Sequence, residues 1–200
     1  MSDANKITYG LSNVHVWPIV STDAAGKPTY GTVITVPGAK EMTLSAEGDT
    51  SSFYADNILY WTAEANNGYS GSLTIAEIPE EFAKEILNQL VDVNGVLIED
   101  ATATGTEFAM AFEFEGDKSK KKVLFYRCTA GRPDVGSSTK EDNIEPNTQE
   151  LSITAVPRLD NHYVKASITD ATSSAYQNWY GEAPYEPTLA AASGSGGSGE

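Results

Sequence analysis

The stretch from residue 53 to residue 91 decides the fold of this chain: FYADNILYWTAEANNGYSGSLTIAEIPEEFAKEILNQLV. It contains an aromatic-rich polar segment, then a short alternating strand, then a segment of helical character. Pro79 suits the first helical position, and apolar residues recur at helical spacing from Phe82 to Val91. The stretch therefore predicts one packed α-helix at about residues 79–93, preceded by a strand and a long loop.

Short alternations of apolar and polar residues, separated by turn residues, fill much of the remaining chain. The clearest alternation runs from Phe108 to Glu115, and a Gly-Asp-Lys-Ser turn separates it from a partner strand. Period-two alternation with frequent turns is typical of antiparallel sheets. We therefore expect a mainly β fold, an antiparallel β-sandwich or partial barrel, with one packed helix, a long protruding loop and extended terminal arms.

The C-terminal part of the chain changes in composition. Asp170 can cap a short helix that runs toward Trp179. Beyond Gly181 the chain becomes rich in Pro and Ala, and it ends in SGSGGSGE, which is the composition of a linker. We predict one domain over residues 1–181 and a tail or linker over residues 182–200, either a natural junction to a further domain or an expression scar.

The overall composition argues against several classes of partner. With 13 basic and 28 acidic residues the formal net charge is -15, so nucleic-acid phosphates and anionic membrane surfaces should repel the chain. Cys128 is the single cysteine, which rules out an intrachain disulfide, and no apolar run has the length of a membrane span. We expect a protein folded in a reducing cytoplasm, with no membrane partner, along which DNA could pass without adhering.

Residues that usually carry catalysis do not form a recognisable set. His15 and His162 are the only histidines, and neither lies at metal-ligand spacing from the other or from Cys128. No G-x-S-x-G elbow, dinucleotide fingerprint or phosphate-binding loop occurs. The sequence therefore predicts a protein that is not an enzyme and that holds no cofactor and no metal.

Residues 47–71 interrupt the alternation with a long polar segment that is rich in aromatic residues. Disordered loops are poor in aromatic residues, whereas Tyr and Trp are common anchors of protein interfaces. The segment could be a long β-hairpin folded over its own domain, or a protruding arm that buries its aromatic residues on another subunit. In the second interpretation the interface residues are Asp49, Phe53, Tyr54, Asp56, Asn57, Tyr60, Trp61 and Tyr69.

Charge is unevenly distributed along the chain. Between Glu41 and Ala83 there are eight acidic residues and no Lys or Arg, while lysines gather at a predicted hairpin tip. Head-to-tail association pairs different patches of one chain, so an acidic arm and a basic tip could meet, although chance segregation would give the same pattern. The lysines of this possible electrostatic interface are Lys118, Lys120, Lys121 and Lys122.

Five segments of the chain are informative because they occur together and in this order: GLSNVHVWPI, VPGAKEMTLSAEGDTSSFYADNILYW, GYSGSLTIAEIPEEFAKEIL, TAVPR and DNHYVKASI. Together they resemble the major tail protein family of long-tailed bacteriophages, whose members are tail tube subunits. The combination of FYADN with SGSLTIAEIP and the following helix carries most of the specificity. The resemblance covers most of the chain.

The resemblance implies a β-sandwich with one packed helix, and hexameric rings whose inner strands join into a continuous β-barrel. Such rings would stack into a tail tube through which DNA passes without specific binding. Tape measure, tail terminator and baseplate proteins would be the partners. The loop that reaches a neighbouring subunit or ring maps onto residues 47–71. The chain would then be a virion protein of the tail, assembled in the host cytoplasm.

Two other functions are weighed against this expectation. A baseplate or receptor-binding β-domain of a phage tail would use the aromatic loop for a cell-surface ligand and stop at a small closed oligomer. A small hydrolase with an unrecognised site is the third possibility. If the first function is right, deleting Asp49–Asn67 should leave a folded monomer and abolish tubes.

Overall fold

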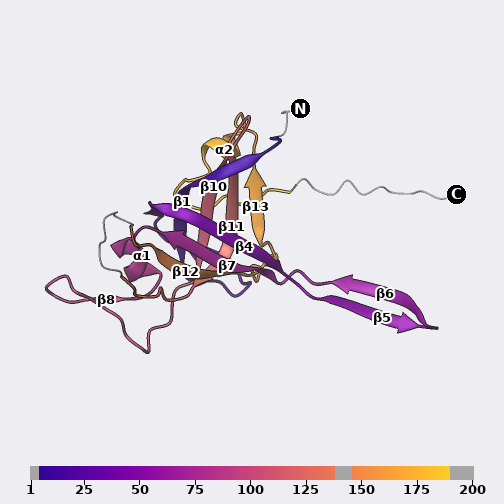
Figure 1. The fold of residues 1–200 in the computed structure, drawn as a ribbon, viewed down its shortest axis with the longest axis horizontal. Coiled ribbons are helices and arrows are strands. Elements are labelled where there is room, and N and C mark those ends of the chain that lie inside the picture. The colour runs from indigo at the N-terminus through magenta and orange to yellow at the C-terminus, as the bar shows by residue number, and fades with distance from the viewer. Residues whose placement is uncertain (1–4, 138–145, 190–200) are drawn as a thin grey trace.

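One antiparallel sheet forms the body of the protein in the computed structural model, which describes residues 5–137 and 146–189 (Figure 1). Nine strands of the described part join in the order β2-β1-β10-β11-β12-β7-β4, with β3 beside β1 and β13 beside β11. The strands are β1 (Thr8–Thr22), β2 (Pro28–Tyr30), β3 (Ile34–Val36), β4 (Ala39–Glu47), β7 (Gly68–Ile75), β10 (Phe108–Gly116), β11 (Lys121–Ala130), β12 (Gln149–Ala155) and β13 (Lys165–Ile168).

The sheet folds over itself at β11, because this strand changes its partner along its length. Its first half pairs with β13, from Lys122 to Phe125, and its last residues pair with β12, from Cys128 to Ala130. In Figure 1, β4, β7 and β12 consequently run across β10, β11 and β13. The prediction of a mainly β, antiparallel fold is confirmed, and the curled sheet stays open and does not close into a barrel.

The main core lies between these two layers of the folded sheet. Alternate residues of β10 face it, and the large side chains of Phe108 and Met110 are completely buried there. Leu73 of β7 and Leu151 of β12 face it from the opposite layer. The alternation that predicted these strands therefore also marks their core face.

A second core covers the other face of β10 and β11. Trp17, Leu124 and Tyr126 pack there against Trp179, which follows the helix α2 (Ser174–Gln177). Because both faces of β10 are covered, the intervening Ala109 and Ala111 are buried as deeply as its large residues. The C-terminal segment thus closes the second core.

The body continues past the predicted boundary at residue 181. The Tyr185 ring stacks on Trp179 at 5.5 Å between centroids, and the Glu186 carboxylate pairs with Arg158. Helix α2 is capped by Ser173, whereas Asp170 closes a turn before it by accepting hydrogen bonds from Thr172. The predicted cap at Asp170 is therefore three residues early, and the Gly/Ser-rich ending lies outside the described residues.

The predicted helix over residues 79–93 is much shorter in the structure. Helix α1 spans Glu80–Glu85 and ends at Ile86. Phe82 and Ile86 are buried in the main core as their spacing predicted, but Asn88 adopts a positive φ of 53° and turns the chain away. The Asn88 side chain holds this turn by donating to the Thr104 carbonyl at 2.5 Å.

The chain beyond this turn projects from the body and does not form further helical turns. Its two-stranded sheet pairs β8 (Leu90–Val91) with β9 (Leu97–Ile98). Leu90 and Val91, which the helical stripe placed in the core, are exposed there. The expectation of one long packed helix was wrong at its C-terminal half, because the next apolar residues have no core face to cover.

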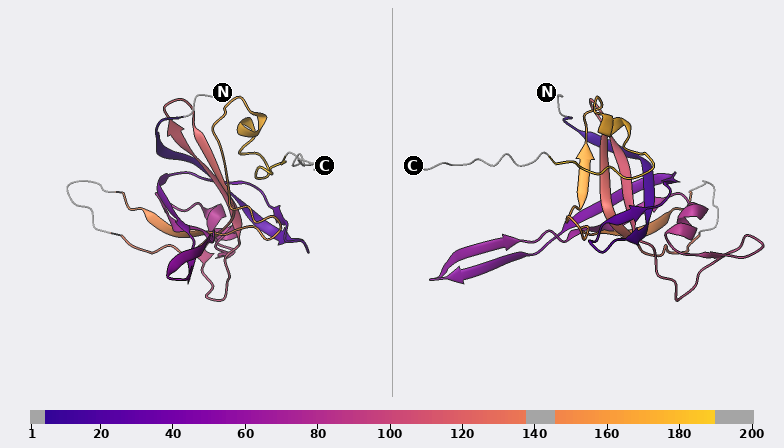
Figure 2. Two further views of the ribbon diagram at one scale, coloured as in Figure 1. Left: turned by 90° about the vertical axis from the view of Figure 1, so that its right-hand side faces the viewer. Right: turned by 180° about the vertical axis from the view of Figure 1, so that it is seen from behind.

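The expected long loop at residues 47–71 is largely regular structure. It forms the hairpin of β5 (Thr50–Ala55) and β6 (Ile58–Glu64), which projects from the body in Figures 1 and 2. Asp56 and Asn57 connect the strands, and both have positive φ, 51° and 60°. Two residues of this conformation form the type I′ turn that matches the twist of a hairpin.

Candidate functional site

The projecting hairpin, residues 48–67 and here called the arm, exposes large apolar side chains that nothing in the described chain covers. Its strands pair only with each other, as a two-stranded sheet. Isolated two-stranded sheets are marginally stable in water, and solvent-exposed apolar side chains in such number are typical of interaction sites. The exposed set is Phe53, Tyr54, Ile58, Leu59, Tyr60 and Trp61, each more than half exposed.

Both faces of the arm are apolar. Phe53 lies opposite Trp61 and the next residue, Tyr54, lies opposite Leu59. Successive residues of a strand point to opposite faces, so these two pairs lie on different faces of the arm. Tyr60 fits between them at a register shift and meets the Phe53 ring edge-on at 6.5 Å. An arm of this kind has apolar surface to bury on two sides.

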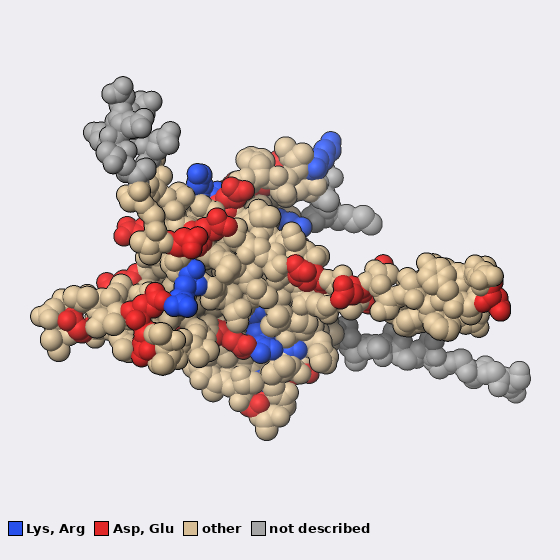
Figure 3. Space-filling view, turned by 60° about the horizontal axis from the view of Figure 1, so that its bottom comes forward, with Lys and Arg blue, Asp and Glu red and all other residues tan. Residues whose placement is uncertain are grey.

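The arm carries charge only near its two ends. Glu47, Asp49 and Glu64 lie at the root and Asp56 at the tip, and Figure 3 shows an uncharged surface between them. No Lys or Arg occurs from residue 41 to residue 83. The arm is therefore uncharged between its acidic ends, and its exposed apolar side chains lie in the half that is nearer the tip.

The root of the arm continues the strands of the body. Backbone hydrogen bonds from Ala65 to the Asp49 carbonyl and from Asn67 to the Glu47 carbonyl join the arm to β4 and β7. Just beyond, Gly71 of β7 lies so close to β4 that a Cβ atom there would overlap the Thr43 carbonyl oxygen. The arm is thus an extension of two paired strands, and its direction follows theirs.

Tyr69, predicted with the arm residues, lies in the body instead. It belongs to β7 and is paired with Ala46 of β4 and Ala155 of β12. Its ring meets the Phe125 ring edge-on at 5.2 Å. Of the predicted aromatic interface residues, four are brought together on the arm, and Tyr69 forms part of a separate groove.

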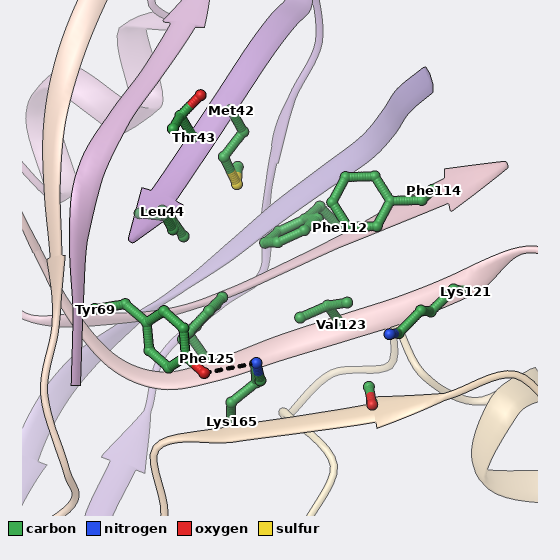
Figure 4. Close-up of a pocket in the computed structure, with 11 residues that line it drawn as sticks. Met42, Thr43, Leu44, Tyr69, Phe112, Phe114, Lys121, Val123, Phe125 and Lys165 are labelled. Carbon is green, nitrogen blue, oxygen red and sulfur yellow. Dashed lines mark hydrogen bonds between the residues drawn. The ribbon is translucent and has the colours of Figure 1, made fainter. Parts of the chain in front are cut away.

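This groove opens between the two layers of the folded sheet, beside the root of the arm (Figure 4). Its volume is about 430 Å³. Met42 and Leu44 of β4 face apolar side chains of β10 and β11 across it, and Lys121 and Lys165 lie along its β11–β13 side. The remaining lining residues are Thr43, Tyr69, Phe112, Phe114, Val123, Phe125 and Ser167.

The four lysines of the predicted basic patch do not form one surface. Lys120 pairs with Glu113 at 2.7 Å and with Glu115 at 2.9 Å, and Lys122 is buried, with its ammonium 4.0 Å from the Tyr176 ring centroid. Lys121, between them in the strand, points to the groove on the opposite face. Lys118 lies in the turn, where its backbone N–H donates to Asn5.

Lys120 and Lys122 belong to a network of charged groups around Glu113. Burial would raise the pKa of the Glu113 carboxyl, but the hydrogen bond and charge of Lys120 outweigh it, so the pKa is lowered. Burial lowers the pKa of Lys122, which also donates to the Tyr176 carbonyl at 3.0 Å. Lys122 thus holds the C-terminal segment on the sheet, and Lys120 neutralises Glu113, which accepts from the Tyr180 hydroxyl of that segment at 3.3 Å.

Arg158 anchors the same segment at a second point. Its side chain is 1% exposed and donates to Asp160 at 2.6 and 2.9 Å and to Glu186 at 2.5 Å. Burial would lower the pKa of Arg158, but these two carboxylates reverse the effect and raise it. The arrangement neutralises a buried cation and has no free group for chemistry.

The exposed projection at residues 88–106 is a feature that sequence reasoning missed. Asn94-Gly95 stands between two apolar runs, which is a strong hairpin signal, but the same pair also fits the end of the helix predicted over residues 79–93. Asp92 closes the turn by accepting from the backbone N–H groups of Asn94 and Val96. The apolar side chains it exposes are Leu90, Val91, Val93, Val96, Leu97 and Ile98.

Within residues 5–137 and 146–189, no three His, Cys, Asp or Glu side chains lie together as a metal site would require. No helix among them is both long enough and apolar enough to span a membrane. Cys128 is buried, and burial raises the pKa of its thiol.

No protein-family model matches the chain, and a search of curated proteins finds no match.

Proposed function

We propose that this protein is a structural subunit that assembles with copies of itself into stacked rings, forming the tail tube of a long-tailed bacteriophage. The observation that carries the proposal is the arm, which presents six large exposed apolar side chains on a hairpin held away from the body. Exposure of such an apolar surface to water is unfavourable, and its burial against another subunit would be favourable.

The size of that gain is comparable to the cost of association. Full burial of one large apolar side chain contributes about 1.5–3 kcal/mol, so six of them supply a gain of the same order as the roughly 4–15 kcal/mol that association costs. Two apolar faces on one arm also suit insertion between neighbours better than contact with a single flat surface. The sequence resemblance supports the same function, with hexameric rings around a tape measure protein.

The charge of the chain suits a conduit for DNA. A net charge of -15 repels phosphate, so DNA could move along the inner surface without adhering. Within the described residues, β4 and β13 each have an edge to which no strand is paired, which supports ring formation because strands of neighbouring subunits can pair with such edges.

The alternative is a baseplate or receptor-binding β-domain that binds a cell-surface ligand through the aromatic arm. The exposed Trp61, Tyr54 and Tyr60 favour it, since aromatic rings also stack on sugars. This alternative predicts a small closed oligomer that does not elongate.

Electron microscopy and sedimentation velocity over a range of concentrations distinguish the two functions. Rings and tubes from the intact chain, and monomers from a variant in which residues 49–67 are replaced by Asn-Gly, are expected for the tube subunit. Normal tubes from the arm-less variant would refute the role of the arm. A discrete oligomer that binds polysaccharide would favour the alternative.

A further inference from the structure

We propose that the groove between β4 and β11 receives the aromatic arm of a second copy of this chain. This inference rests on the proposed function and identifies the surface through which copies would join head to tail. The groove has a volume of about 430 Å³, within the roughly 300–1,000 Å³ of pockets that bind small organic groups. It is therefore large enough for one or two aromatic side chains of an arm tip.

The chemistry of the groove matches that of the arm. Its floor is apolar, with Phe112, Val123 and Phe125 buried and Met42 and Leu44 half-buried. Lys121 and Lys165 lie along one side of it, whereas the arm is acidic at its ends and carries its apolar side chains toward the tip. An inserted arm would bury apolar surface on apolar surface and bring carboxylates toward ammonium groups.

The arm cannot enter the groove of its own chain. Met42 and Leu44 of the groove precede the arm in β4, so the groove adjoins the root of the arm. The eight residues from Gly48 to Ala55 carry the tip roughly 25 Å away at the rise of a β-strand. An arm tip in the groove is therefore that of another copy, and a contact between two different patches of one chain propagates.

The other exposed apolar surface is a poorer acceptor for the arm. The projection at residues 88–106 carries Asp92, Glu99 and Asp100 and contains no Lys or Arg. An acidic arm tip with Asp56 would be repelled there. Among the exposed apolar surfaces of the described chain, the groove is the one edged by lysines, Lys121 and Lys165.

Two variants with complementary defects test the inference. The arm-less variant, with residues 49–67 replaced by Asn-Gly, keeps the groove and can only accept. The groove variant, Lys121→Glu with Lys165→Glu, keeps the arm and can only donate. Lys6→Glu with Lys27→Glu is the matched control, since it makes the same change of net charge at two exposed lysines outside the groove and outside β4. Circular dichroism and thermal melting establish that each variant is folded.

The expected result has two parts, measured by sedimentation velocity and native mass spectrometry. The groove variant should assemble only at a concentration at least tenfold higher than wild type, while the control assembles as wild type does. An equimolar mixture of the arm-less and groove variants should give a complex of one copy of each, because the intact groove of the first takes the intact arm of the second.

Contrary results separate the inference from the function. If the groove variant and its control both form wild-type tubes while the arm-less variant does not, the groove is not the acceptor and the tube function stands. If the mixture gives no complex, the inference is overturned as well. If the intact chain forms neither rings nor tubes at any concentration, the proposed function fails independently of the groove.

Discussion

The Lys165 ammonium donates a hydrogen bond to the Tyr69 hydroxyl at 2.8 Å and lies 4.5 Å from the centroid of the same ring. The two residues come from β13 and β7, which are not neighbours in the sheet. The contact therefore joins the two layers across the mouth of the groove. It links Lys165, at the side of the groove, to β7, the strand that follows the arm.

Removal of this contact should loosen the groove slightly and leave the fold intact. Tyr69→Phe and Lys165→Met should each lower the free energy of unfolding by about 0.5–1 kcal/mol, because the bond is partly exposed to water. Chemical denaturation measures both, and the double variant gives their coupling. Lys40→Met, at an exposed lysine of β4, is the control and should change stability less. Fully additive losses would show that the two side chains do not interact.

The buried Glu113 carboxylate should make stability depend on acid pH. Its folded-state pKa lies below the ordinary value of 4.5, since Lys120 outweighs the effect of burial. The stabilisation is therefore complete above pH 4.5 and is lost as the pH falls through the lower, folded-state pKa. Glu113→Gln should cost about 1–3 kcal/mol at pH 7 and flatten the decline of unfolding free energy in acid.

The matched variant for this prediction is Glu115→Gln, two residues along the same strand. Its carboxylate also pairs with Lys120, but its side chain is 40% exposed. The loss at pH 7 should therefore stay below about 1 kcal/mol. Equal acid sensitivity of wild type and Glu113→Gln would contradict the assignment of the pH dependence to Glu113.

The shortened helix can be tested with two apolar residues of the same predicted stripe. Phe82 is buried and meets Phe108 edge-on at 5.9 Å, so Phe82→Ala should cost about 3–5 kcal/mol. Leu90 is 56% exposed, so Leu90→Ala should change stability by about 0.5 kcal/mol or less. Urea unfolding measures both. A large loss at Leu90 would mean that the helix continues to the predicted end.

The C-terminal boundary of the body can be tested by truncation. A chain that ends after residue 189 should be as stable as the full chain over the described body. A chain that ends after residue 181 loses the Tyr185 ring from Trp179 and leaves buried Arg158 with one of its two carboxylate partners. We expect it to lose about 2–4 kcal/mol. Equal melting temperatures of the two chains would place the boundary at residue 181 after all.

The strand pattern was predictable from sequence because period-two alternation reports directly which face a residue takes. Phe108 to Phe112 illustrate this, since each apolar residue at the predicted inner face is buried. The same pattern could not reveal that the opposite face of β10 is also covered. That burial depends on Trp179, which is distant in sequence, and local periodicity carries no signal for it.

The errors have an equally local cause. Phe82 to Val91 keep helical spacing, but spacing cannot show where the core surface ends, and Asn88 stops the helix first. The sequence leaves residues 47–71 open between a hairpin folded over its own domain and a protruding arm, and the structure shows a hairpin that projects. Asp56-Asn57 is a weaker turn signal than Asn-Gly, so the sequence did not locate the turn. The groove combines residues of β4, β7, β10, β11 and β13, so only the folded chain displays it.

A substitution in the turn of the arm tests whether the paired hairpin is needed for copies to associate. Asn57 has a φ of 60°, which a β-branched residue adopts only at a cost of about 1–2 kcal/mol, whereas Gly adopts it freely. Because the arm makes no sheet contact with the body beyond its root, Asn57→Val should unfold the arm and leave the melting temperature of the body unchanged. Asn57→Gly should keep both the hairpin and assembly.

Amide hydrogen exchange and sedimentation velocity together check this expectation. Loss of protection in β5 and β6 for Asn57→Val should accompany at least a tenfold rise in the concentration at which copies associate, corresponding to about 1.4 kcal/mol. The aromatic side chains of the arm are all still present in this variant, so any loss of assembly arises from their arrangement alone. If Asn57→Val lost its hairpin protection and still assembled as wild type does, the paired strands of the arm would not be what a neighbouring copy recognises.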